Sequence, residues 1–187
     1  MTEIEEKRLI TRAAKGEEAA FETLIAGHER RMYAVALRMT SNAEDAKDCL
    51  QDAIVRIYKS LSGFKGDSAF STWAYRIVVN VCLDNHRRQK VRFAQSLDAL
   101  SENGWNPEDE KQRPDSAAEN NLLRHTISTC INKLPIDMRT AIVLRDVQGF
   151  SYEDISKIMD INVGTVKSRI SRGREKLRTM LTESGVV

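Results

Sequence analysis

The chain has 187 residues, of which 41% are hydrophobic and 30% charged, so it holds enough apolar material for a buried core and is not a wholly disordered protein. Its longest uncharged apolar runs, such as Ile77–Leu83, are far too short to span a membrane, and we expect no direct membrane insertion. The net charge of +2 is uneven, because residues 1–92 and 123–187 carry +3 and +4 whereas residues 93–122 carry −5, a distribution that points weakly toward nucleic acid.

The first hundred residues contain no proline and therefore permit long helices. Thr2 and Glu5 have the spacing of a capping box, and Gly16 is placed to end the first helix. We predict a second helix over residues 17–39. A third helix is predicted to begin with a capping box of Ser41 and Glu44 and to end at Gly63. Its apolar residues recur at steps of three and four, as on one face of a helix: Ala46, Leu50, Ala53, Ile54, Ile57 and Leu61.

The polar face of this third helix allows two interpretations. It gathers Glu44, Asp45, Asp48, Gln51 and Asp52, with Arg56 and Lys59 farther along. Acidic residues in the first turns of a helix interact favourably with its dipole, so the face can serve helix stability alone. The same face also suits a basic or mixed helix of a protein partner.

A loop over residues 64–70 leads into a further helix, predicted from about Ser71. The apolar residues Trp73, Ile77 and Val81 lie opposite a polar line, which consists of Arg76, Asn80, Asp84 and Arg87, and the basic run 86–92 follows. Aromatic side chains beside a basic helix suit single-stranded nucleic acid, whose bases stack or enter a pocket while cations follow the backbone. The competing interpretation, which these residue types favour, makes Phe64, Phe70 and Trp73 core anchors.

Helical periodicity fails over residues 93–116, where two prolines, a glycine and an acidic cluster predict a flexible linker. Further helices are predicted at residues 117–132, 136–147, 152–159 and 163–181. No alternating strand pattern persists anywhere in the sequence. The predicted fold class is therefore all-α, with two helical domains at residues 1–92 and 117–187.

The last two predicted helices form the sharpest motif. A capping box at Ser151 opens a short helix, residues 160–162 make a tight turn, and a longer helix follows. One face of the longer helix is apolar or small: Val166, Ile170, Gly173 and Leu177. The other carries Ser168, Ser171 and Arg172, flanked by Thr165, Lys167, Arg169 and Arg174. This pattern predicts a DNA-binding helix-turn-helix, and a merely solvated basic face is the alternative that it leaves open.

The composition argues against an enzyme. The sequence has no GxxxxGK[ST], no HExxH and no nucleophile elbow. Three scattered histidines and three widely spaced cysteines without a CxxC pair argue against a metal site and a disulfide framework, and they suit a reducing cytoplasm. We expect no cofactor, no metal and no small-molecule substrate. A stand-alone helix-turn-helix regulator is the runner-up function, but it leaves residues 44–92 unexplained.

Four segments taken together resemble the extracytoplasmic-function sigma factors, the minimal bacterial class that keeps two of the sigma domains. They are DAKDCLQDAIVRIYKSL (45–61), GFKGDSAFSTWAYRIVVNVCLDNHRR (63–88), LPIDMRTAIVLRDVQGFSYEDISKIM (134–159) and VGTVKSRISRGREKLR (163–178). The resemblance spans about residues 5–91 and 117–181. It implies that the chain binds RNA polymerase core, recognises the −35 and −10 promoter elements of DNA and helps to melt the promoter.

The resemblance also implies residue roles by matching position. Contacts to the clamp of the largest polymerase subunit fall on Asp48, Gln51, Asp52 and Arg56, although many relatives carry Glu at the position of Asp52. Contacts to the −10 element fall on Phe64, Lys65, Phe70, Ser71, Asn80, Asp84, Arg87 and Arg88. In the −35 set the base readers are Lys167, Ser168, Ser171 and Arg172, and the phosphate contacts are Arg145, Thr165, Arg169 and Arg174. Because the position of Ser171 varies across the family, the −35 base preference stays open.

The same resemblance implies a further partner, an anti-sigma factor. In this family such a partner is typically anchored in the membrane and clamps the two domains. We therefore expect a cytoplasmic protein that an anti-sigma factor can hold near the membrane.

Overall fold

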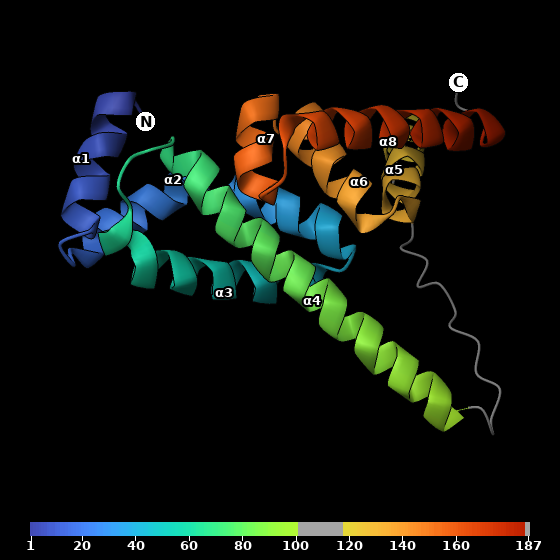
Figure 1. Ribbon diagram of the computed structural model, residues 1–187, viewed down its shortest axis with the longest axis horizontal. Coiled ribbons are helices and arrows are strands. Elements are labelled where there is room, and N and C mark those ends of the chain that lie inside the picture. Colours follow the sequence, from blue (N-terminus) through green and yellow to red (C-terminus); the bar gives the residue numbers. More distant parts are fainter. Residues whose placement is uncertain (101–117, 186–187) are drawn as a thin grey trace.

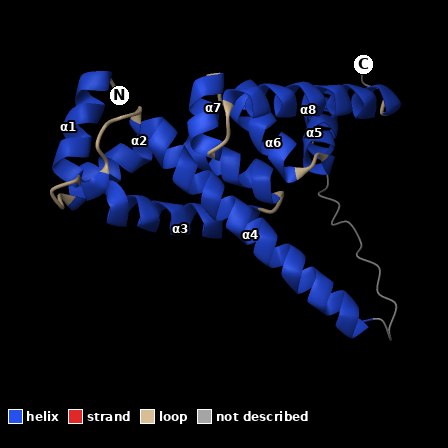
Figure 2. Ribbon diagram, in the orientation of Figure 1, coloured by secondary structure: helices blue, strands red, loops and turns tan. Residues whose placement is uncertain are grey.

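The computed structural model describes residues 1–100 and 118–185, and within them the chain forms only helices and their connections (Figures 1 and 2). We call residues 1–100 the N-terminal module; it contains α1 (Glu3–Ala13), α2 (Glu18–Thr40), α3 (Ala43–Ser60), the 3-10 turn η1 (Leu61–Gly63) and α4 (Phe70–Leu100). We call residues 118–185 the C-terminal module; it contains α5 (Ala118–Lys133), α6 (Ile136–Ile142), the π-helical turn η2 (Val143–Val147), α7 (Tyr152–Met159) and α8 (Val163–Glu183). The predicted all-α class is confirmed. None of the described helices is long and apolar enough to cross a membrane.

Side-chain caps mark where α1, α3, α7 and α8 begin, and the cap of α3 corrects the sequence prediction. The capping box of Thr2 and Glu5 is present as predicted. The predicted box of Ser41 and Glu44 is wrong, because the side chain of Asn42 caps α3 by accepting hydrogen bonds from the backbone amides of Glu44 and Asp45. Ser41 instead ends α2 in the left-handed region at φ 60°, so the two helices are joined within two residues.

Helix α4 is longer than the sequence pattern predicted. It continues to Leu100, so the first eight residues of the predicted linker, 93–100, are helical. These residues include neither glycine nor proline, and nothing in their backbone chemistry ends a helix before Gly104. Figure 1 shows the far end of α4 extending beyond the other described elements. The rest of the predicted linker, residues 101–116, lies outside the described residues.

The N-terminal module is held by an apolar core between α2, α3 and α4. Leu24, Met32, Ile57 and Val78 are completely buried in it, and each such side chain contributes roughly 1.5–3 kcal/mol through burial. The amphipathic stripe predicted for the third helix faces this core, with Ile54 only partly buried at its edge. The outer faces of α3 and α4 therefore remain available for contacts.

In the C-terminal module, α8 lies close against α6 because Gly173 has no side chain. A Cβ at this position would lie 3.0 Å from Cγ1 of Ile142 and 3.5 Å from Cβ of Met138. Val166 and Ile170 are buried on the same side of α8, as the sequence pattern predicts. This packing fixes which face of α8 points outward.

The two modules pack against each other. In Figure 1, α7 lies across the upper half of α4, and it is in contact with α4, while α2 contacts α5, α6 and η2. The rings of Tyr75 on α4 and Phe150 meet edge to face with their centroids 4.9 Å apart, and burial raises the pKa of Tyr75 to about 12. Arg139 of α6 reaches across to α2, where its Nη1 donates hydrogen bonds of 3.2 Å to the carbonyl of Met39 and to the hydroxyl of Ser41.

Candidate nucleic-acid interface

The outward face of α8 presents the candidate base readers. The side chain of Asn162 caps this helix, since its Oδ1 accepts hydrogen bonds from the amide and the hydroxyl of Thr165 at 2.7 and 2.9 Å. With Val166 and Ile170 buried, Lys167, Ser168, Ser171 and Arg172 are left exposed. A basic helix that projects from a tight turn with an exposed N-terminal half has the shape required to enter the major groove.

The candidate phosphate contacts on the same module already have partners within the protein. Arg145 donates to the carbonyl of Phe150 at 2.8 Å, and its guanidinium lies 4.7 Å from the centre of the Tyr152 ring. Arg169 pairs with Asp137 at 3.1 Å. The first contact holds the turn before α7 and the second ties α8 to α6, so both arginines already have partners within the protein.

Arg174 is tied to η2 in the same way. Its Nε donates to Oδ2 of Asp146 at 3.1 Å, and its Nη2 donates to the other carboxylate oxygen. This hydrogen bond raises the pKa of the Arg174 guanidinium. The structure thus divides the eight predicted −35 residues into an outward set and a set with partners elsewhere in the C-terminal module.

The loop before α4 forms an aromatic cluster rather than an open stacking platform. Phe70 is only 2% exposed, and its ring centre lies 5.8 Å from that of Trp73 and 6.0 Å from that of Phe64. Phe64 and Trp73 are partly buried against the core, whereas Lys65 is exposed. The three rings pack on one another and on the core, as the competing interpretation expects, and the −10 contacts of Phe64 and Phe70 stay a prediction.

The polar line on α4 is present and faces outward. Asn80, Arg87 and Arg88 are exposed and Asp84 is half-buried. Arg87 donates to Oδ1 of Asp84 at 3.1 Å. Residue 80 therefore lies on the same exposed side of α4 as the charged residues one and two turns farther along.

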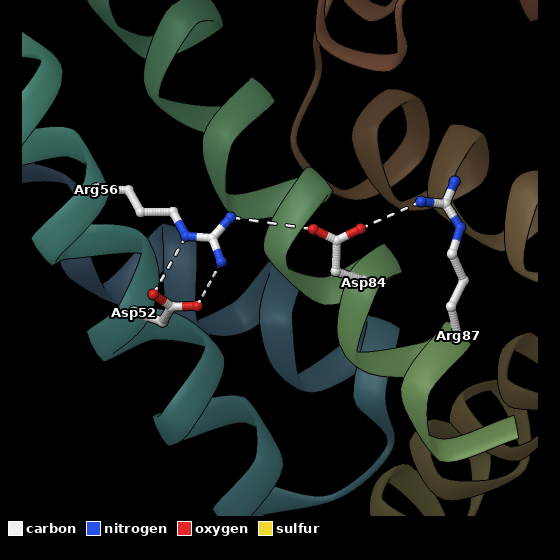
Figure 3. Close-up of polar contacts among 4 residues, drawn as sticks. All are labelled: Asp52, Arg56, Asp84 and Arg87. Carbon is white, nitrogen blue, oxygen red and sulfur yellow. Dashed lines mark hydrogen bonds and ion pairs between the residues drawn. The ribbon is translucent and has the colours of Figure 1, made fainter. Parts of the chain in front are cut away.

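The structure also joins two sets of residues that the sequence pattern kept apart (Figure 3). Arg56 on α3 binds both carboxylate oxygens of Asp52, at 3.2 and 2.9 Å, and its Nη1 lies 3.9 Å from Oδ2 of Asp84 on α4. A chain of ion pairs thus connects the predicted polymerase contacts to the predicted −10 contacts. Because these side chains are 43–74% exposed, each pair contributes only about 0.2–1 kcal/mol to stability.

A groove between α2 and α3 is a feature that the sequence pattern missed. It is lined by Tyr33 and Arg30 of α2 and by Gln51, Leu50 and Ile54 of α3, among others. Gln51 belongs both to this groove and to the exposed acidic face with Asp48. The spacing of residues within one helix cannot reveal such a groove, because half of its lining comes from another helix.

Both modules match known families. Residues 24–92 match the family model described as Sigma-70 region 2, and residues 124–177 match the model described as Sigma-70, region 4. The "RNA polymerase sigma-H factor" of Pseudomonas aeruginosa is 34% identical over 182 residues, which cover 95% of this chain and 94% of that protein. The "ECF RNA polymerase sigma-E factor" of Escherichia coli is 35% identical over 173 residues, which cover 90% of each chain.

The fold is also similar to that of a solved sigma factor structure. The chain is similar to the structure titled "Co-crystal structure of the sigma factor RpoE in complex with the anti-sigma factor NepR from Bartonella quintana". The TM-score is 0.71 at 27% sequence identity, and the match covers 87% of this chain and 96% of that one. The matched families span both helical modules, including residues 44–92, which a stand-alone helix-turn-helix regulator leaves unexplained.

Proposed function

This chain belongs to the extracytoplasmic-function family of RNA polymerase sigma factors, and from that premise we propose how its residues divide the work. A sigma factor of this kind binds RNA polymerase core, recognises the −35 and −10 elements of a promoter and promotes melting. It is a transcription initiation factor and not an enzyme. The proposal concerns which face of which helix carries each task.

Polymerase docking is assigned to the outer face of α3. Asp48 and Gln51 are exposed there, and Asp52 is held in place by Arg56. The groove between α2 and α3 that includes Gln51 widens this face. A basic or mixed helix, such as the clamp coiled coil of the largest subunit, has the complementary charge.

Recognition and melting of the −10 element are assigned to α4 and the loop before it. Lys65 and the exposed residues Asn80, Arg87 and Arg88 provide polar and cationic contacts for a displaced strand. Ser71 is half-buried at the start of α4, beside the aromatic cluster. The ion-pair chain through Asp84 links this surface to α3, so polymerase docking and strand contact share one network.

Recognition of the −35 element is assigned to the outward set on α8. Arg172 is the side chain best suited to bidentate contact with guanine in the major groove. Lys167, Ser168 and Ser171 flank it on the exposed face. We also assign phosphate contacts to this module, at Arg145, Thr165, Arg169 and Arg174. The three arginines contact phosphate while they keep their partners within the protein.

We further infer regulation by an anti-sigma factor. The relative from Bartonella quintana was solved in complex with one. In this chain the two modules are in contact, and an anti-sigma factor that binds both of them would stabilise this arrangement. We therefore propose that the chain is cytoplasmic and that the anti-sigma factor holds it near the membrane.

The observation that carries this proposal is the exposure of Lys167, Ser171 and Arg172 on a helix whose Arg169 and Arg174 are engaged within the protein. The test is run-off transcription by purified bacterial polymerase core on a promoter library, with and without the full chain. We expect initiation at defined promoters only when the chain is present. The core preparation is first checked with another sigma factor. If that core then starts at no defined site when this chain is added, the proposal is overturned.

A further inference from the structure

Helices α3 and α4 run antiparallel in a register that places two cysteines together. Gln89 on α4 donates a hydrogen bond to Asp45 on α3 at 2.9 Å. Asn85 lies one turn before Gln89 and donates to Sγ of Cys49 at 3.2 Å, and Cys49 lies one turn after Asp45. Cys82 lies a further turn back on the same side of α4 as Asn85. Both cysteines are buried in the core that these helices share.

The surroundings of the two thiols differ in a way that separates their chemistry. The Asn85 amide donates to the Cys49 sulfur, and the neighbouring Cys82 thiol and this amide together lower the pKa of Cys49 from 9.0 to about 7. The interaction between the two thiols, together with burial, raises the pKa of Cys82. Both thiols are buried, at 4% exposed for Cys49 and 1% for Cys82, so it is the lower pKa of Cys49 that makes it the better nucleophile toward a small oxidant.

We propose that Cys49 and Cys82 form a redox-modification site, at which a peroxide oxidises Cys49 and Cys82 then closes a disulfide between α3 and α4. The Cys49 thiolate attacks one peroxide oxygen and the O–O bond breaks, so the sulfur becomes a sulfenic acid and the departing hydroxide takes up the proton that Cys49 released and leaves as water. Cys82 attacks that sulfur, the S–O bond breaks, and the departing hydroxide takes the Cys82 proton and leaves as water. With hydrogen peroxide, two thiols lose two electrons and two protons in total, and the peroxide becomes two molecules of water.

The disulfide acts on the surface directly above it. Asp48 and Asp52 are within one turn of Cys49, and Asp84 is two residues after Cys82. A disulfide requires Cα atoms about 4.4–6.8 Å apart, so its formation fixes the spacing of α3 and α4 at this point. The Arg56–Asp84 pair, at 3.9 Å, spans the same two helices and responds to that spacing. This consequence rests on the proposed function, whereas the chemistry of the site does not.

The chemistry is tested on the full chain without polymerase. The protein is treated with hydrogen peroxide and digested without reductant, and its peptides are mapped by mass spectrometry. We expect peptides holding Cys49 and Cys82 to be joined with the loss of two hydrogen atoms, and dithiothreitol to separate them. In Cys82→Ala the sulfenic acid on Cys49 should instead be trapped by dimedone, and Cys130→Ala is the matched control that should form the disulfide normally. Circular dichroism checks that each variant is folded.

Two results would overturn the site: Cys49 that remains a thiol while Cys130 is oxidised, or a disulfide that joins either cysteine to a second chain. The effect on function is measured separately, after catalase has removed the peroxide and before core is added. We expect run-off transcription to fall for the oxidised wild type, to return on reduction and to be unchanged in peroxide-treated Cys82→Ala. If the disulfide forms but the oxidised protein supports full transcription, the redox site is confirmed and its control of transcription is overturned. No transcription by the reduced protein would contradict the proposed function instead.

Discussion

The hydroxyl of Thr72 on α4 donates a hydrogen bond of 3.0 Å to Oδ1 of Asp154 on α7, so a polar contact joins the two modules at the start of the helix assigned to the −10 element. Thr72 is only 3% exposed. The other carboxylate oxygen of Asp154 accepts from the hydroxyl of Ser151 at 2.6 Å, at the N-cap of α7. One carboxylate therefore both closes the first turn of α7 and binds α4.

Replacing Thr72 with valine removes this hydroxyl without changing the shape of the side chain. We expect the contact between the modules to weaken by about 1–3 kcal/mol, because a half-buried carboxylate oxygen loses its donor. Small-angle X-ray scattering should show a larger radius of gyration, and urea unfolding should show a lower midpoint. The matched control is Thr23→Val, which removes a hydroxyl bonded within α2 to the carbonyl of Ala19. Equal changes in both variants would show that Thr72 has no special part in closure.

Arg139 makes another polar connection between the modules. It donates to the carbonyls of Met39, Leu134 and Asn132 and to the hydroxyl of Ser41, and burial lowers the pKa of its guanidinium. Arg139→Met keeps the aliphatic packing and removes every donor. We expect the free energy of unfolding to fall by roughly 3 kcal/mol, since several carbonyls lose a charged partner.

Guanidinium-induced unfolding measures this loss. The control Arg172→Met changes an exposed arginine and should alter stability by no more than about 0.5 kcal/mol. Arg139→Lys should recover part of the stability, because one charged donor remains at the site. A loss no greater for Arg139→Met than for Arg172→Met would mean that water satisfies the freed carbonyls.

Where local residues carry the information, the sequence predicts the structure well. Helix α7 has the predicted bounds because Ser151 caps its start and Asp160 takes a left-handed conformation at its end. The buried face of α8 follows equally from the spacing of its apolar residues. Both features depend on contacts within a few residues along the chain.

Features that depend on distant contacts were not predictable in this way. Arg139 binds the backbone of Met39, one hundred positions away, and Tyr75 meets Phe150 across the two modules. No periodicity within a single helix encodes such pairs.

Charge reversal on the outer face of α3 tests the polymerase contact. Asp48→Lys combined with Asp52→Lys should raise the dissociation constant for core by about tenfold or more, which corresponds to about 1.4 kcal/mol. The protein should remain folded, because both positions lie outside the buried core. Glu22→Lys, an exposed charge reversal on α2, is the control. Fluorescence anisotropy with labelled protein measures the affinity, and an unchanged value for the double variant would place the docking face elsewhere.

The reactivity of Cys49 should follow pH around neutrality. Its pKa is lowered to about 7, below the ordinary 9.0 of a thiol, so its thiolate fraction and alkylation rate should rise steeply between roughly pH 6 and 8. Cys82→Ala removes the largest cause of that shift and should move the inflection to higher pH. Iodoacetamide labelling followed by peptide mass spectrometry gives the rate at this site alone. The same inflection in Cys82→Ala as in the wild type would mean that Cys82 does not donate to Cys49.

Arg172 and Arg174 lie two residues apart on α8 and should fail in different ways. Arg172→Ala removes an exposed side chain assigned to guanine, so it should cost about 1–3 kcal/mol in recognition and relax the preference at one −35 position. Arg174→Ala removes the partner of Asp146, so it should weaken transcription similarly on every −35 sequence and also lower stability. Run-off transcription on a library randomised at the −35 element measures both variants together. An unchanged base preference in Arg172→Ala would exclude it from the base readers and leave Lys167, Ser168 and Ser171 to carry the recognition.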